Sequence, residues 1–172
     1  PLKKLADLLK EFGPEALRAC LTAMLPAFLI GYYHHVEYAV PFLIAAMNAS
    51  MTEFPGRKTD KLKIAGWGIA SSTVTALLIG SLLPFPFLLI GTVALAAGIF
   101  GLFNALGQRI AMVGVTNLFM LTFTMGLQLQ NPVQFSLFVF LGTAFYHCII
   151  FIHFKLDPVW DLKRAIANSY LA

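Results

Sequence analysis

Charged side chains are scarce in this chain. Asp, Glu, Lys and Arg together make up 12% of the 172 residues, whereas hydrophobic residues make up 59%, and the mean hydropathy is +0.79. A soluble globule of this size needs more polar residues than this to cover its surface. None of the eight Asp and Glu residues lies near the middle of an apolar stretch. The composition therefore excludes a soluble domain, and the chain lacks the relay of intramembrane carboxylates that proton-coupled pumps usually carry.

Sequence signatures of catalysis are also absent. The chain has no phosphate-binding Walker loop, no G-x-S-x-G elbow, no H-E-x-x-H pair and no CxxC cluster. Its two cysteines, Cys20 and Cys148, lie within apolar stretches, so we expect no disulfide and interpret both thiols as buried packing groups. The first twelve residues are too polar for a cleavable signal peptide. We expect neither an enzyme nor a bound cofactor.

Six apolar stretches are predicted to cross a membrane as helices. A span needs about 20 mostly apolar residues to cross a hydrocarbon layer roughly 30 Å thick. The predicted spans are residues 16–33, 38–50, 62–83, 87–103, 110–127 and 133–154. The second is short and contains Pro41, Asn48 and Ser50. We therefore expect it to be kinked, broken or sheltered from lipid by its neighbours.

All 12 Lys and Arg residues fall on one side of the membrane when these stretches are counted as spans. They occur before the first span or within its first three residues, after the second span or within the first two residues of the third, and after the fourth and sixth spans, whereas the alternate connections 34–37, 84–86 and 128–132 contain none. Lys and Arg are retained on the cytoplasmic side during insertion. The sequence thus predicts an all-α polytopic membrane protein with six transmembrane helices and cytoplasmic N and C termini. The net charge of +4 then reflects topology and contact with anionic lipid headgroups, and no nucleic-acid partner is expected.

Polarity divides the chain into three parts. Residues 1–13 alternate Leu and Phe with Lys at helical spacing, which predicts an interfacial amphipathic helix. Residues 14–154 form the transmembrane domain. In residues 155–172, Asp157 and Pro158 supply an N-cap and a first-turn proline for a helical pattern that continues to the end. We interpret this last part as the truncated start of a cytoplasmic helical domain, and the whole sequence as a piece of a larger protein.

Two polar connections are considered as binding sites. His34, His35 and Glu37 lie in the first outer turn, but adjacent histidines do not share a helix face and no third nitrogen or sulfur ligand is nearby, so a solvated turn is favoured over a metal site. A pH or substrate sensor remains an alternative there. Arg57 and Lys58 lie in the loop between the second and third spans. They are interpreted either as topological anchors or as attractors for anions at the cytoplasmic mouth.

Polar residues inside the last two spans are candidates for a transport pathway. Asn117, Thr124 and Gln128 recur at helical spacing along one face of the fifth span. Polar side chains in spans usually face the bundle interior or a wet cavity, but interhelical hydrogen bonds require the same placement, so both interpretations stay open. Tyr146 and His147 lie in the sixth span, where His147 either carries a proton or bonds to a neighbouring helix.

Small residues recur along the third and fourth spans. The third carries Gly68, Ser71, Ser72 and Thr75 on one stripe, and the fourth carries Ala94, Gly98 and Gly101. Small side chains let helix backbones approach closely in lipid, so packing is favoured over pore lining for both stripes. Because six spans without central charges make a poor pathway alone, we expect a homo-oligomer or a second homologous half, with the fourth span as a contact surface.

Four short motifs occur along the chain: Ala-Leu-Arg-Ala-Cys-Leu at 16–21, Thr-Glu-Phe-Pro-Gly-Arg at 52–57, Asp-Lys-Leu at 60–62 and Gly-Gln-Arg at 107–109. Together they resemble the fusaric-acid-resistance (FUSC) family and, within it, the YccS-type bacterial inner-membrane proteins. Residues 157–172 also look like the start of that family's cytoplasmic region. The resemblance implies a multi-pass protein of the bacterial inner membrane, with six membrane helices, a cytoplasmic helical domain and often a second copy of both.

The resemblance also implies a function. The family includes exporters of aromatic carboxylic acids and is similar to the aluminium-activated malate channels of plants, in which positive residues line an anion path between subunits. The matching positions here are Arg57 and Arg109. Arg109 also has a physical case, because it begins a span, where the positive end of a helix adds to its own charge and a carboxylate can pair with it. We expect efflux of organic anions, with an anion channel or a non-transporting membrane anchor as alternatives.

Overall fold

A computed structural model describes residues 19–33, 36–53, 58–127 and 131–156. These ranges are helical and contain no strand, which confirms the all-α prediction. The elements are the helix Ala19–Tyr32, α2 (Val36–Met51), α3 (Lys58–Leu82), α4 (Pro86–Leu102), the 3₁₀ helix η1 (Phe103–Leu106), α5 (Gln108–Gly126) and α6 (Pro132–Leu156). The interfacial helix predicted for residues 1–13 lies outside the described residues, as does the cytoplasmic stretch after Leu156.

The helices coincide with the six predicted spans to within a few residues. Three of them are long and apolar enough to cross a membrane: Thr59–Leu82, Pro86–Leu106 and Pro132–Ile152. The apolar helices Ala19–Tyr32, Val36–Met51 and Ile110–Gly126 are shorter. A membrane-type helical bundle is therefore what this sequence forms. The crossing of all six helices and the cytoplasmic position of both termini stay predictions.

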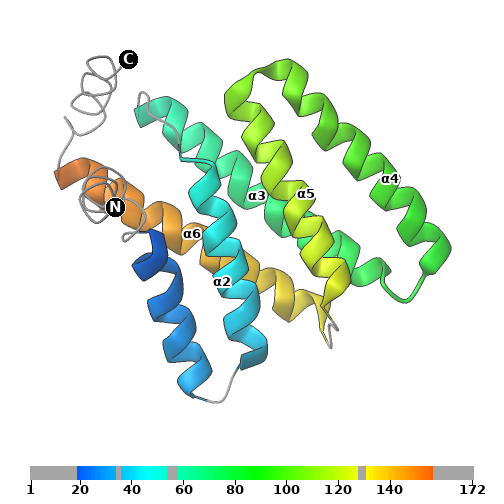
Figure 1. Cartoon of the computed structure of the whole chain (residues 1–172), viewed down its shortest axis with the longest axis horizontal. Helices are drawn as coiled ribbons and strands as arrows, with labels where there is room; N and C mark the ends of the chain where they lie inside the picture. The colour runs from blue at the N-terminus through cyan, green and yellow to red at the C-terminus, as the bar shows by residue number, and fades with distance from the viewer. Residues whose placement is uncertain (1–18, 34–35, 54–57, 128–130, 157–172) are drawn as a thin grey trace, which may run out of the picture.

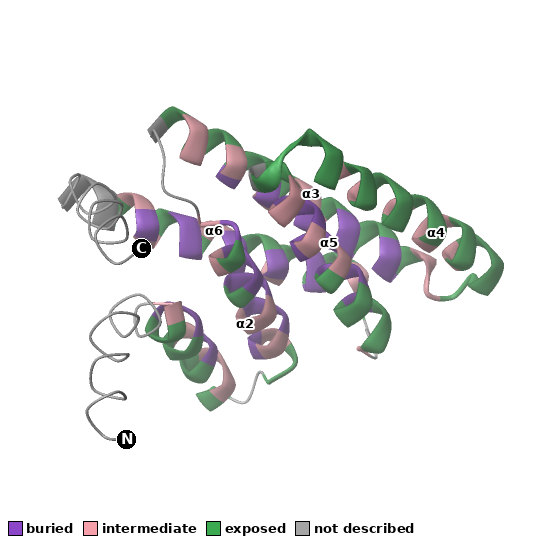
Figure 2. Ribbon diagram, turned by 45° about the horizontal axis from the view of Figure 1, so that its top comes forward, coloured by how far each residue is buried: buried purple, intermediate pink, exposed green. Residues whose placement is uncertain are grey.

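Four helices form the centre of the bundle. α6 packs against α2 on one side and α3 on the other, and α3 in turn packs against α5. Figure 1 shows the helix Ala19–Tyr32 and α4 at opposite ends of this arrangement. The helix Ala19–Tyr32 packs through Ala23 and Ala27 onto buried residues of α2 and α6, including Ala46, Phe42 and Tyr146. α4 packs mainly on α5 and has no buried residue (Figure 2).

The short second span is sheltered by its neighbours. α2 is a continuous helix of 16 residues that includes Pro41. At 1.5 Å per residue it is about 24 Å long, less than the hydrocarbon thickness. Its buried residues include Pro41, Phe42 and Asn48, because α6 and α5 cover it. Among the three outcomes expected for this span, shelter is confirmed and a break is wrong.

Two glycines permit the closest helix contacts. A methyl group on Gly142 would collide with the Phe42 carbonyl, so α6 approaches α2 only because position 142 has no side chain. A Cβ on Gly114 would lie 2.5 Å from the Phe100 carbonyl oxygen, which ties α5 to α4 in the same way. The three packing candidates of the fourth span, Ala94, Gly98 and Gly101, are instead exposed on the outside of α4. Their proposed contact with another copy or half stays a prediction.

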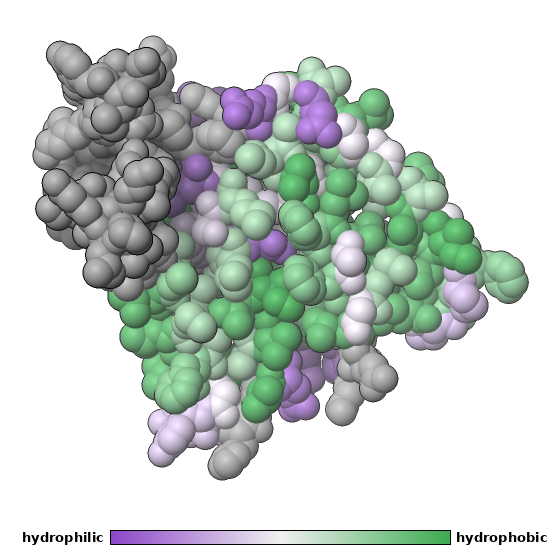
Figure 3. Space-filling view, viewed as in Figure 1, coloured by the Kyte–Doolittle hydropathy of each residue, from purple (hydrophilic) through white to green (hydrophobic). Residues whose placement is uncertain are grey.

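The outer surface of the bundle is apolar. Large hydrophobic side chains are exposed on every helix, among them Phe28, Trp67, Phe87 and Ile152. Figure 3 shows a face that is mostly hydrophobic, with hydrophilic groups mainly toward its two margins. Lipid tails are the natural neighbours of such a surface. Cys20 and Cys148 are free, as expected, but both are exposed, so their interpretation as buried packing groups was wrong.

Candidate functional site

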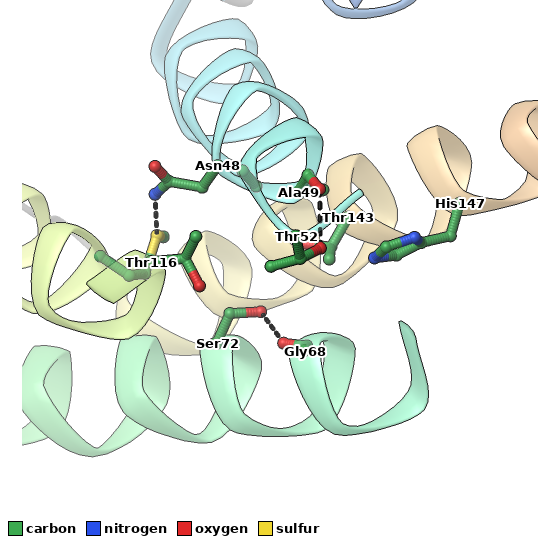
Figure 4. Close-up of a pocket in the computed structure, with 10 residues that line it drawn as sticks. Asn48, Ala49, Thr52, Gly68, Ser72, Thr116, Thr143 and His147 are labelled. Atoms are coloured by element: carbon green, nitrogen blue, oxygen red, sulfur yellow. Dashed lines mark hydrogen bonds between the residues drawn. The ribbon is translucent and has the colours of Figure 1, made fainter. Parts of the chain in front are cut away.

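A small polar cavity lies where the four central helices meet. α2 contributes Asn48 to it, α3 contributes Gly68 and Ser72, α5 contributes Thr116, and α6 contributes Thr143 and His147; Thr52, just after α2, completes the polar lining (Figure 4). Ala45, Ala49 and Met120 supply its apolar walls. The volume open to the centre of a water molecule is about 10 Å³. That is about the space that one buried water needs.

The hydroxyl groups around this cavity can act there as hydrogen-bond acceptors. Thr52, Ser72 and Thr143 each donate to a carbonyl of their own helix segment: Thr52 Oγ1 to Ala49 O at 2.8 Å, Ser72 Oγ to Gly68 O at 2.7 Å and Thr143 Oγ1 to Val139 O at 2.8 Å. Their protons are thus committed, while the oxygen lone pairs remain available. A carboxylate would find few donors here. The cavity suits a water molecule or another hydrogen-bond donor.

His147 points its ring into the cavity (Figure 4). It is 7% exposed, and its Nε2 atom is buried without a hydrogen-bond partner among the described residues. Gly68 faces this nitrogen: a Cβ built on it would lie 3.9 Å from Nε2, an ordinary van der Waals distance. Gly68 has no side chain that could form a hydrogen bond with Nε2. An unsatisfied buried polar atom costs about 1–3 kcal/mol. The cavity therefore needs a ligand for Nε2, and one water fits.

The neighbouring Tyr146 reaches an acidic residue. Its hydroxyl donates to Glu53 Oε2 at 3.0 Å, and its side chain is 1% exposed. Glu53 lies two residues after the end of α2 and is half-buried. Thr52, the residue before Glu53, lines the same cavity as His147. Sequence reasoning placed Glu53 in a polar loop and assigned it no role, because no local spacing connects position 53 with position 146.

The polar stripe of the fifth span is used for helix packing in this conformation. Asn117 is fully buried; its Nδ2 donates to Ser71 Oγ at 2.8 Å and to Val113 O at 2.7 Å, and Thr75 Oγ1 donates to its Oδ1 at 3.4 Å. Thr124 is also fully buried and donates to Met120 O at 2.7 Å. Neither side chain lines the central cavity. The third candidate of this stripe, Gln128, lies outside the described residues.

A larger hollow lies between the first residues of α3 and the first residues of α5. Its volume is about 510 Å³, and its lining residues are Asp60, Lys63, Ile64, Leu106, Gly107, Gln108 and Ile110. The turn into α5 requires a glycine, because Gly107 has φ of +107°, where other residues are strained. Gly107 O then accepts from the backbone N–H groups of Ile110 and Ala111. The turn therefore presents the first residues of α5 to the hollow beside Lys63.

The anion-binding candidates are described only in part. Arg109 is the second residue of α5, at the edge of this hollow by its position in the chain, but its side chain lies outside what is described. The same holds for the side chain of Lys58, the first residue of α3, and for all of Arg57. The histidines His34 and His35 lie outside the described residues as well. In the described ranges, no group of three His, Cys, Asp or Glu side chains could hold a metal ion.

Comparison with known proteins identifies the family. A family model described as FUSC-like inner membrane protein yccS matches residues 67–172, which include most of α3 and all of α4, α5 and α6. No curated protein and no solved structure matches the chain. The match agrees with the apolar helical bundle and covers more than half of the sequence. The chain belongs to the FUSC-like family of inner membrane proteins.

Proposed function

We propose that this protein exports organic carboxylate anions, aromatic ones included, across the inner membrane as part of a larger or oligomeric transporter. Membership of the FUSC-like family places it among membrane transport proteins in general. The observation that carries the finer proposal is the hollow of about 510 Å³ at the start of α5. Its size lies within the range of small-molecule sites, which run from about 300 to 1,000 Å³.

The chemistry of this hollow suits a carboxylate. Lys63 supplies a positive charge, and the first backbone N–H groups of α5 add the positive end of a helix. Arg109, two residues after Gly107, is the proposed partner for a bidentate contact with the anion. Asp60 lines the same hollow and opposes anion binding, so both basic residues are needed to keep the local charge positive.

Transport into proteoliposomes tests this proposal. The full chain would be reconstituted, and uptake of labelled benzoate or succinate would be measured against concentration. Arg109→Lys keeps the charge but loses the planar fork, which should cost about 1.5–3 kcal/mol of binding and raise the apparent KM about tenfold or more. Lys63→Gln should also raise KM. Lys61→Gln is the matched control, since Lys61 lies two residues away on α3 and does not line the hollow.

The result distinguishes a transporter from the second candidate, a membrane anchor. The anchor is favoured by the closed interior: the central cavity admits about one water, and Asn117 is bonded across α3 and α5. Uptake no faster than in empty liposomes would establish the anchor. Uptake that is insensitive to Arg109→Lys, Arg109→Ala and Lys63→Gln would move the anion site elsewhere. Single-channel current in a planar bilayer would identify a channel instead of an exporter.

A further inference from the structure

We propose that His147 and Glu53 form a proton-exchange pair that couples proton entry to anion export. This inference rests on the proposed function, because it supplies the ion whose movement would drive that export. The geometry that carries it is a buried imidazole nitrogen without a partner among the described residues, aimed into a water-sized cavity, with a carboxylate beside Tyr146, the preceding residue of the same helix.

The cavity offers hydrogen-bond acceptors to an N–H group on His147 Nε2. The hydroxyl groups of Thr52, Ser72 and Thr143 donate hydrogen bonds to backbone carbonyls. Their oxygens can therefore accept a hydrogen bond from Nε2–H or from a water bound to it. One water fits the space. Hydrogen-bond donors around Nε2 would suit a bound anion. The hydrogen-bond acceptors that line the cavity instead suit a proton carried on Nε2.

Glu53 is the charge that balances a proton on His147. Of the residues facing the cavity, α2 contributes Asn48, α3 contributes Ser72 and α5 contributes Thr116, all uncharged. The described helix Ala19–Tyr32 contains no charged residue, and its titratable Cys20 is exposed. On α6 itself Tyr146 bonds to Glu53, and Cys148 is exposed. Glu53 directly follows Thr52, which lines the cavity, and its carboxylate lies beside the Tyr146 hydroxyl.

The connection to the cytoplasmic side follows the chain. Thr52 lines the cavity and immediately precedes Glu53, which lies in the connection between α2 and α3. His147 lies nine residues before Leu156, the last residue of α6, which corresponds to about 14 Å along the helix. By the predicted topology, this connection and the end of α6 are cytoplasmic. The pair thus spans the distance from the bundle interior to the inner surface.

The exchange is a simple proton transfer. A proton from the outer side adds to the Nε2 lone pair and forms an imidazolium. The Nε2–H bond then breaks, and the proton passes through the cavity water to a Glu53 carboxylate oxygen and from there to cytoplasmic water. Neutral imidazole and carboxylate are restored, and no electron moves. The Tyr146 hydroxyl holds the carboxylate in place during the exchange.

Two measurements on the full chain test the pair. Proteoliposomes containing the pH dye pyranine report proton movement during benzoate transport, in the presence and absence of an imposed pH gradient. We expect wild type to respond to the gradient. His147→Gln and Glu53→Gln should keep downhill benzoate movement and lose both the gradient response and the dye signal. His153→Gln, a change of the other histidine in α6, should retain both.

The second measurement does not depend on transport. In ¹⁵N-histidine NMR of the detergent-solubilised protein, one ring signal that is absent from His147→Gln should shift as the pH is lowered. Its midpoint should move in Glu53→Gln. A His147 signal that stays neutral throughout, or a gradient response that survives His147→Gln, would overturn the pair. Absence of benzoate transport by wild type would instead reject the proposed function, and the NMR titration would still decide the proton site.

Discussion

The hydroxyl of Tyr146 donates a hydrogen bond of 3.0 Å to the carboxylate of Glu53, 93 positions earlier in the chain. The bond joins the end of α2 to the middle of α6, the two helices whose backbones also meet at Gly142 and Phe42. It brings an acidic group to a bundle whose helices contain no acid near their centres. The contact therefore has both a structural and a chemical consequence.

Tyr146→Phe should reduce stability. A hydrogen bond to a charged group contributes about 1.5–3 kcal/mol when buried, but Glu53 is half-buried and water competes for it, so we expect a loss of about 1 kcal/mol. Thermal unfolding in detergent would measure it. Glu53→Ala should lower stability as well, and the double variant should lose less than the sum of the two. Additive losses would mean that the two side chains do not interact.

Gly142→Ala should separate α6 from α2. The added methyl group meets the Phe42 carbonyl, and backbone cannot move aside as a flexible side chain can. Overpacking of this kind costs about 1–3 kcal/mol, seen as a lower melting temperature. Gly66→Ala is the control, because nothing lies within 4 Å of its Cβ position, and alanine should be neutral or stabilise α3 by up to about 1 kcal/mol. Equal melting temperatures for the two variants would contradict the close approach.

Asn117 should be coupled energetically to Ser71. Each interhelical hydrogen bond in a membrane bundle contributes about 0.6 kcal/mol on average and up to about 1.7. Because Asn117 is fully buried and donates to Ser71 across the α3–α5 contact, we expect a value at the upper end. A double-mutant cycle with Asn117→Ala and Ser71→Ala would measure the coupling directly. Asn104→Ala is the control, since Asn104 is exposed and donates to Gly101 O within its own turn. A coupling energy of zero in this cycle would mean that the hydrogen bond does not stabilise the contact between α3 and α5.

Gly98→Leu should weaken assembly without unfolding the chain. Gly98 has no neighbour within 4 Å and lies on α4, which has no buried residue, so the larger side chain has room within one copy. If α4 forms the contact with another copy, leucine prevents the close approach of the helices. Cross-linking in native membranes would report a smaller oligomeric share at an unchanged melting temperature. Gly66→Leu, on the exposed side of α3, serves as control. An unchanged oligomeric share would indicate that this face of α4 meets lipid.

Alkaline phosphatase fused after Ala172 should remain inactive. The enzyme folds only outside the cytoplasm, and the distribution of Lys and Arg retains the C terminus inside. A fusion after Pro84, in a connection without basic residues, should be active and serves as the positive control. Strong activity after Ala172 would reverse the topology, and with it the cytoplasmic position of Glu53 and Arg109.

The positions of the helices in this protein follow from local features of the sequence. Hydrophobic length and the polar or glycine- and proline-containing connections are local properties, so the spans predicted at residues 62–83 and 133–154 agree with α3 and α6 to within four residues at each end. Polar groups in a span avoid lipid, so the burial of four side chains could also be predicted from the sequence. They are Asn117, Thr124, Tyr146 and His147. The family was predicted from short motifs, of which Gly-Gln-Arg at 107–109 and the stretch 157–172 lie within the residues that the family model matches.

The contacts between helices and the hydrogen-bond partners of their polar residues could be seen in the three-dimensional packing alone. Helix association in lipid has no strong hydrophobic drive and depends on steric fit, so nothing local in the sequence selects Gly142 and Gly114 as contacts or places Gly98 outside. For the same reason Glu53 was overlooked: its partner is distant in sequence and close in space. The cavity around His147 exists because four helices happen to bring small polar side chains to one point, and such a point has no signature along a single chain.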